Sequence, residues 1–164
     1  MEENELDEEV SEFVSKNLWK IITSKNKPEI KLQEIIEEIS SFFNIEKCSL
    51  MLKDELGLFF IVASHGLPSK IVKTTRIREG EGNAGLAIKE KSAIFMKKIE
   101  LSKDKFEKRY KTDSFISYPI EDNGEIIGLL NLTDKKYDIY LSEKDLEAIV
   151  PIIERIKFVI RDIK

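Results

Sequence analysis

The chain has 164 residues and carries 27 Lys and Arg against 31 Asp and Glu, a formal net charge of −4. This length is enough for one domain with one core, and the acidic balance argues against direct binding to nucleic acid. The N-terminus, MEENELDEEV, is unlike a signal peptide, and no run reaches the roughly 18 apolar residues of a membrane span. A single cysteine, Cys48, cannot form an internal disulfide. We therefore expect a cytoplasmic protein that contacts neither nucleic acid nor a membrane.

The first part of the sequence predicts two amphipathic helices. Apolar residues recur at spacings of three and four over residues 5–24, and again from Pro28 to about Asn44. Pro28 suits the first turn of the second helix, because a proline there gives up no helical hydrogen bond.

Short apolar runs follow, and their spacing is typical of strands. The clearest pair flanks Asn123-Gly124, since Asn-Gly between two apolar runs is the strongest local signal for a β-hairpin. A short helix is predicted from Ala84 to about Lys91, and the polar residues 100–113 are expected to form a long loop. The predicted strands are residues 47–53, 58–65, 74–78, 92–99, 114–120 and 125–132.

The chain ends in another predicted helix, with Ser142 as N-cap and Asp145 three residues on, close to a capping box. Its apolar residues form a heptad seam, and Val150, Ile152 and Val159 form a second stripe beside it. One of the two stripes can pack on the chain's own sheet and the other on a partner helix. We expect this seam to pair two copies of the chain together with the first helix, and to continue into an effector domain that is absent here. The predicted dimerisation residues are Val10, Phe13, Leu146, Ile149, Ile153, Ile156, Ile160 and Ile163.

Helices at both ends with hairpins between them predict an α+β fold, in which an antiparallel sheet carries the terminal helices on one face. We divide the chain into an N-terminal dimerisation helix (residues 1–27), a core (28–140) and a C-terminal signalling helix (141–164).

Few residues offer chemistry. Gly80-x-Gly82-x-x-Gly85 matches the dinucleotide-binding motif, but the charged run before it and the short helix after it favour a turn that leads into a helix N-terminus. His65 and Cys48, the only residues of their kinds, lie on different predicted strands, so we expect no metal, no cofactor and no catalytic centre. The lysine-rich segment 97–111 is either a solvated loop or a positive lid over a pocket for an anionic small molecule.

The order of the elements and four local strings resemble a GAF domain. The strings are KCSLMLKDELG (47–57), FFIVASHGLP (59–68), REGEGNAGLAIKEKSAIFMKK (78–98) and SFISYPIEDNGEIIGLLNLTDKKY…LSEKDLEAI (114–149). Asn131 to Lys135 resembles the family's Asn-to-Lys stretch, although Leu141 replaces the aromatic residue that precedes the final acid. Among GAF proteins, RYKTDSFISYPI (109–120) followed by a short hairpin looks like the N-terminal regulatory domains of bacterial signalling proteins, including nitrogen-fixation-type sigma-54 transcription activators.

The resemblance implies a six-stranded antiparallel sheet, with a small-molecule pocket under the inner helix and loops on the face away from the terminal helices. Carried over by position, the residues implied to bind a ligand are Ser49, Ser64, His65, Asn83, Ala84, Thr112, Ser114 and Ser117. It further implies a homodimeric sensor that binds an unknown effector and controls an output domain, in transcription regulation. Two alternatives stay open: a GAF domain that serves only for dimerisation, and a free methionine sulfoxide reductase, which would need reactive cysteines in the pocket.

Overall fold

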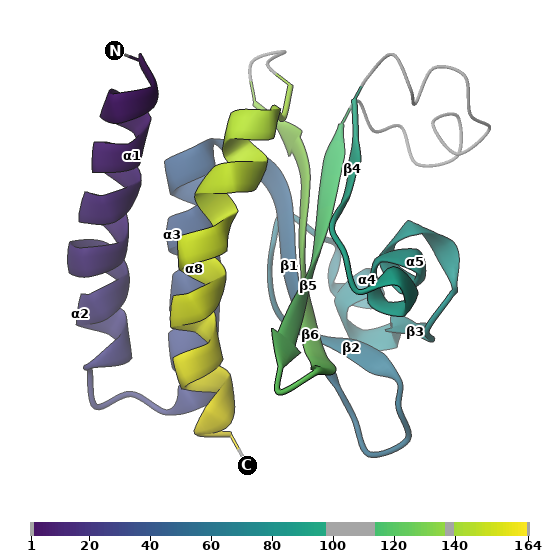
Figure 1. The fold of residues 1–164 in the computed structure, drawn as a ribbon. Helices are drawn as coiled ribbons and strands as arrows, with labels where there is room; N and C mark the ends of the chain where they lie inside the picture. Colours follow the sequence, from purple (N-terminus) through teal and green to yellow (C-terminus); the bar gives the residue numbers. More distant parts are fainter. Residues whose placement is uncertain (1, 98–113, 137–139, 164) are drawn as a thin grey trace.

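The computed structural model describes residues 2–97, 114–136 and 140–163 as one antiparallel sheet between two helical layers (Figure 1). Helices α3 and α8 cover one face, with α1 packed outside them on the same side, and the short helices α4 and α5 lie on the other face. We call these the helix face and the α5 face. The two-sided arrangement and the terminal helices on a single face confirm the predicted fold class.

The helix layer is built from both ends of the chain. An N-terminal helix runs as α1, a π-helical turn η1 and α2, and the C-terminal helix α8 packs beside it and α3. Pro28 opens α3, as predicted, and the predicted capping box of Ser142 and Asp145 opens α8. The bounds are α1 Glu2–Glu12, η1 Phe13–Leu18, α2 Trp19–Ile22, α3 Pro28–Phe43, α4 Ser69–Thr74, α5 Gly82–Glu90 and α8 Glu143–Arg161.

The six strands follow the order β3-β2-β1-β6-β5-β4, and every neighbouring pair is antiparallel. The long strands β1 and β6 lie at the centre, and the two- and three-residue strands β3 and β4 lie at the edges. The bounds are β1 Ile45–Lys53, β2 Phe59–His65, β3 Arg76–Ile77, β4 Ile94–Met96, β5 Phe115–Asp122 and β6 Glu125–Lys135.

The buried apolar residues form one cluster on each face of the sheet. The larger cluster joins the helix layer to residues such as Leu50, Leu130 and Leu132. The smaller one joins α5 to Met51, Phe59 and other residues of the opposite face. Because side chains alternate along a strand, these neighbours show which face each intervening polar residue occupies.

Helix α4 was not expected from the sequence. It has six residues and buries none of them, so it lacks the apolar periodicity that reveals a helix. The predicted loop 100–113 lies outside the described residues. Among those that are described, no helix combines the length and the hydropathy needed to cross a bilayer.

The predicted dimerisation seam lies inside this chain instead of on its surface. Val10, Phe13, Ile149, Ile153, Ile156 and Ile160 belong to the core cluster of the helix face, and Leu146 and Ile163 pack against it. The second stripe is also mostly buried; only Val150 is exposed. The heptad spacing therefore marks a stripe that packs on the chain's own sheet and helices, and six of the eight predicted dimerisation residues are buried within the single chain.

The glycine motif forms the turn before α5, as its sequence context favoured. A Cβ on Gly85 would lie only 2.5 Å from the Arg78 carbonyl oxygen, so the first turn of α5 sits directly on the preceding turn. The motif follows a two-residue edge strand and opens a nine-residue helix, unlike the full strand-crossover-helix unit of dinucleotide-binding folds.

Candidate functional site

Four polar residues form a row across the middle of the α5 face. Strand pairing places Ser64, Ser49, Asn131 and Ser117 side by side on β2, β1, β6 and β5. Ser117 Oγ donates a hydrogen bond to Asn131 Oδ1 (2.7 Å), and Asn131 Nδ2 donates to Ser49 Oγ (3.3 Å). We call these four residues the polar row.

The row borders the apolar patch on which α5 packs. Met51 and Leu129 are strand partners on β1 and β6, two residues from Ser49 and Asn131. Both belong to the smaller core cluster, together with residues of α5. Ser49 and Ser117 are buried, while Ser64 and Asn131 are half-buried. A few hydrogen-bonding groups among otherwise apolar side chains are typical of small-molecule sites.

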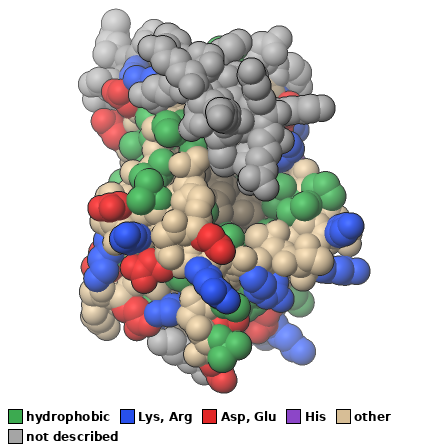
Figure 2. Space-filling view, turned by 90° about the vertical axis from the view of Figure 1, so that its right-hand side faces the viewer, with side chains coloured by type: hydrophobic (Ala, Val, Ile, Leu, Met, Phe, Trp, Pro, Cys, Tyr) green, Lys and Arg blue, Asp and Glu red, His purple; other side chains and the backbone are tan. Residues whose placement is uncertain are grey.

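The hydrogen bonds among the described residues leave donors for a ligand. One N–H of the Asn131 amide is used by Ser49, and the Ser49 oxygen accepts that bond, so within the described part of the chain a second amide N–H and the Ser49 hydroxyl hydrogen have no acceptor. They suit carbonyl, carboxylate or phosphate oxygens. Figure 2, which views the molecule from the α5 side, shows a hollow near the middle of that side.

Of the sequence-predicted ligand residues, the structure brings together Ser49, Ser64 and Ser117. His65 does not join them, because it lies on the helix face, where Nδ1 is 2.8 Å from Glu37 Oε2. The backbone of Ser64 is held by α3: Gln33 Nε2 donates to the Ser64 carbonyl (2.8 Å), and the Ser64 N–H donates to Gln33 Oε1 (3.1 Å).

The other predicted residues have different places. The Ser114 side chain is fully buried, and its Oγ accepts a hydrogen bond from the Leu141 N–H (3.0 Å), so it holds the start of the last helix. Asn83 and Ala84 lie on the first turn of α5, where Ala84 packs against the apolar patch. Thr112 lies outside the described residues.

Asn131 was not among the predicted site residues, although it stands at the centre of the row. The available signal was a lone amide in the apolar run EIIGLLNL, at a position that alternation assigns to the same face as Leu129. The same stretch continues to Lys135, whose Nζ is 3.0 Å from the buried Asp145. The Asn-to-Lys stretch therefore reaches from the polar row to the N-terminus of α8.

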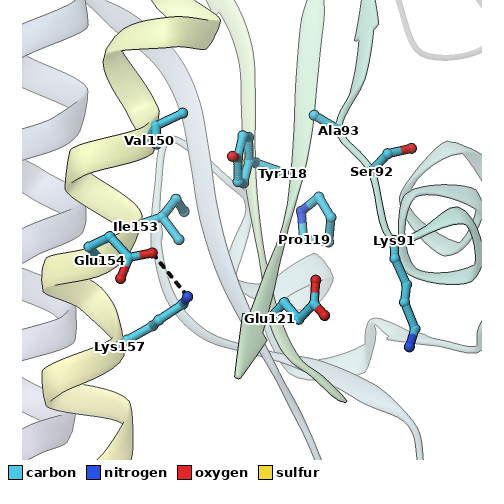
Figure 3. A pocket seen from close by; sticks show the side chains of 10 residues that line it. All are labelled: Lys91, Ser92, Ala93, Tyr118, Pro119, Glu121, Val150, Ile153, Glu154 and Lys157. Atoms are coloured by element: carbon cyan, nitrogen blue, oxygen red, sulfur yellow. Dashed lines mark hydrogen bonds and ion pairs between the residues drawn. The ribbon is translucent and has the colours of Figure 1, made fainter. Parts of the chain in front are cut away.

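A separate recess of about 210 Å³ lies at the β5 edge, between the turn after α5 and α8 (Figure 3). Three of its four charged groups have partners within the chain, since Lys157 pairs with Glu154 (3.0 Å) and Lys91 Nζ donates to the Gly124 carbonyl (2.7 Å). None of the predicted ligand residues that the structure describes lines this recess. Its lining residues are Lys91, Ser92, Ala93, Tyr118, Pro119, Glu121, Val150, Ile153, Glu154 and Lys157.

Cys48 is buried on the helix face, as expected of a small apolar residue on a core strand. Its neighbours in the core are helix-layer side chains. Burial raises the pKa of the thiol to about 12, against a weaker opposing hydrogen bond to Ser40. The only thiol of the chain is therefore both protonated at neutral pH and on the wrong face of the sheet to reach the polar row.

We expect Cys48 to resist alkylation. At pH 8 the raised pKa lowers the thiolate fraction roughly a thousandfold relative to an ordinary thiol of pKa about 8.5. Iodoacetamide labelling followed by mass spectrometry should be slow in the native protein and rapid in urea. Fast native labelling would contradict this placement of Cys48.

Comparison with known proteins agrees with the fold. The GAF domain family matches residues 28–156, whereas none of the curated proteins matches. The GAF domain of Acinetobacter phosphoenolpyruvate-protein phosphotransferase is similar, with 21% identity, a TM-score of 0.74, and coverage of 88% of this chain and 89% of that one.

Two further solved structures show the range of proteins with this fold. The A. aeolicus nlh2 GAF domain in an inactive state has 17% identity and a TM-score of 0.68, over 95% of this chain and 99% of that one. The type II free methionine-R-sulfoxide reductase of Thermoplasma acidophilum has 18% identity and a TM-score of 0.66, over 82% and 92%. At these identities the structures show a shared fold, and together with the family match over residues 28–156 they establish that the chain belongs to the GAF domain family.

Proposed function

We propose that this GAF domain is a sensory module that binds a small polar molecule at the polar row and regulates an attached output domain, in transcription control. The observation that carries the proposal is the hydrogen-bonded row of Ser117, Asn131 and Ser49 on an apolar face. The proposal includes a homodimer in the cytoplasm, with no direct contact to nucleic acid or membrane.

The row also has a physical route to the helix layer. Gln33 of α3 holds the backbone of Ser64, and the stretch from Asn131 to Lys135 ends at the ion pair with Asp145 in the first turn of α8. A ligand that favours one position of these strands would bias the position of α3 and α8. Such a bias requires that the ligand bind the two arrangements with different affinity.

A purely structural GAF domain would have no use for the donors of the row, and a reductase would need a thiol there. The structural similarity to the Thermoplasma reductase favours testing that activity, but the placement of Cys48 on the helix face argues against a thiol mechanism. We therefore propose a non-catalytic role.

A thermal-shift screen of cyclic nucleotides, 2-oxoglutarate and amino acids tests the sensor role. A bound compound at a hundred times its dissociation constant adds about 2.7 kcal/mol, which corresponds to a rise in Tm of roughly 5–10 °C for a domain of this size. We expect at least one compound to give such a shift, and Asn131→Leu to abolish it.

The matched control is Asn17→Leu, which removes an exposed amide in the helix layer and should keep the full shift. Each variant is compared with its own Tm without ligand, because Asn131→Leu also leaves two serine hydroxyls without their partner. If no compound shifts the Tm, or if the shift survives in Asn131→Leu, the row is not a ligand site.

A further inference from the structure

The exposed face of α8 carries large apolar side chains that the fold leaves uncovered. Val150 is 47% exposed and Phe158 is 48% exposed, and Pro151 lies beside them. Figure 1 shows α8 in front of α3, on the side of the sheet away from α5. Exposed apolar groups gathered on one surface are typical of protein contacts.

A groove runs along this face between α8 and the N-terminal helix. It has a volume of about 340 Å³ and is lined by Val14 and Ser11 on one side and by Glu147, Pro151 and Arg155 on the other. Next to it, the Arg155 guanidinium lies 5.7 Å from the centre of the Trp19 ring. The groove is thus apolar at its floor and bordered by charge, as an anchor site for an aromatic side chain would be.

The residues of this face are arranged symmetrically about Glu154. Val150 and Phe158 lie four residues before and after it, and Glu147 and Arg161 lie seven before and seven after. Consider an antiparallel pair of α8 helices whose twofold axis passes Glu154. Each residue that precedes Glu154 in one copy then lies level with the residue that follows Glu154 by the same number of positions in the other copy. Phe158 then comes level with Val150 and next to Pro151, at the groove.

Charge favours the same orientation. The exposed face of α8 is acidic toward its N-terminal end, where Glu143 and Glu147 lie, and basic at its C-terminal end, where Arg161 lies. A parallel pair would set identical charges opposite each other, whereas an antiparallel pair sets Glu147 opposite Arg161 twice. Glu154 at the centre is neutralised by its own Lys157, 3.0 Å away.

Both members of the predicted ion pair are available. Glu147 is exposed and has no ion-pair partner in the part of the chain that the structure describes. Arg161 uses Nε and one terminal nitrogen on Asp122, and its guanidinium has further N–H donors.

We propose that two copies of this chain associate through antiparallel α8 helices, with Phe158 of each copy in the groove between α1 and α8 of the other and with Glu147 paired to Arg161. This inference specifies the surface of the proposed homodimer and replaces the buried heptad seam as its contact. In this arrangement the C-terminal ends of the two α8 helices, each marked by Arg161, lie at opposite ends of the interface. Each α8 would therefore transmit a signal separately.

Analytical ultracentrifugation over a wide concentration range tests the surface. The wild-type chain of 19.0 kDa should sediment as a species of twice that mass, and Phe158→Glu should weaken association about 30-fold or more, as expected for loss of a central aromatic anchor. The matched control is Ile71→Glu, which charges a side chain of similar exposure, 45%, on α4 at the other face, and should associate as the wild type does.

Charge reversal tests the orientation. Glu147→Arg and Arg161→Glu should each weaken the dimer about tenfold or more, and the double variant should regain the wild-type affinity because the attractive pair is rebuilt with reversed signs. In a parallel dimer the single variants would associate as the wild type does. Thermal unfolding checks that Arg161→Glu, which also loses Asp122 as a partner, is folded.

A wild-type chain that stays monomeric overturns both the homodimer and this interface. A dimer that Phe158→Glu or the single charge variants leave intact overturns the interface alone. The sensor role is scored separately, by the ligand-induced Tm shift of Phe158→Glu, because Phe158 is remote from the polar row.

Discussion

Replacing Gly66 with alanine is expected to destabilise the protein by about 3–5 kcal/mol, one of the largest effects of any single change in this chain. Gly66 has a φ of +78°, which disfavours any side chain. In addition, a Cβ at this position would overlap the carbonyl oxygen of Glu46 on β1. Relief would require β1 and the end of β2 to move apart, and this is the region in which Ser49 pairs with Ser64.

Gly57 provides the matched control, because it lies in the turn between the same two strands. Its φ of +83° is similar, but nothing lies within 4 Å of the position that a Cβ would take. Gly57→Ala should therefore lower the free energy of unfolding only by the strain of a side chain at positive φ, about 1–2 kcal/mol. Urea unfolding of both variants measures the difference, and equal losses would show that Gly66 is not pressed against β1.

Ile156→Ala is expected to lower the free energy of unfolding by about 2–5 kcal/mol, because it leaves a cavity in the core of the helix face. Ile156 is completely buried within a single chain, so the loss should be the same at every protein concentration. An Ile156 that instead served the predicted dimer seam would give a loss that depends on concentration.

Phe158→Ala on the same helix is the control for this experiment. Its side chain is half exposed in the single chain, so the monomer should change by no more than about 0.5 kcal/mol. Unfolding monitored by circular dichroism at low concentration separates the two variants. If Phe158→Ala destabilised the monomer as strongly as Ile156→Ala, the assignment of the two faces of α8 would be wrong.

Local sequence signals were sufficient where a single element decides the outcome. The Asn-Gly turn, the Pro28 start of α3 and the Ser142–Asp145 capping box are all interactions between residues a few positions apart. Strand alternation likewise gave the hairpins, since a half-buried strand needs apolar residues at every second position. Helix α4 was not predicted, because a helix that buries no residue needs no apolar side chains at spacings of three and four.

The site was predicted less completely for the same physical reason. Serines at strand positions 49, 64 and 117 were identified, but the sequence could not show that they share a face with Asn131 or that His65 faces the opposite way. The face on which a side chain lies depends on the register between strands, including the irregularity at which Val62 of β2 is an extra residue opposite Leu50 and Met51 of β1. A shift of one residue in that register moves a side chain to the other side of the sheet.

The sequence by itself determined the order of helices and hairpins and the capping of α8, because these follow from short-range periodicity and local hydrogen bonds, while the resemblance of four local strings indicated the family. Only the tertiary structure decided which apolar stripe of α8 is core and which is surface, and which polar residues meet across four strands. Both depend on contacts between segments far apart in the chain, where packing against a particular neighbour, and not the spacing of residues, sets the environment of each side chain.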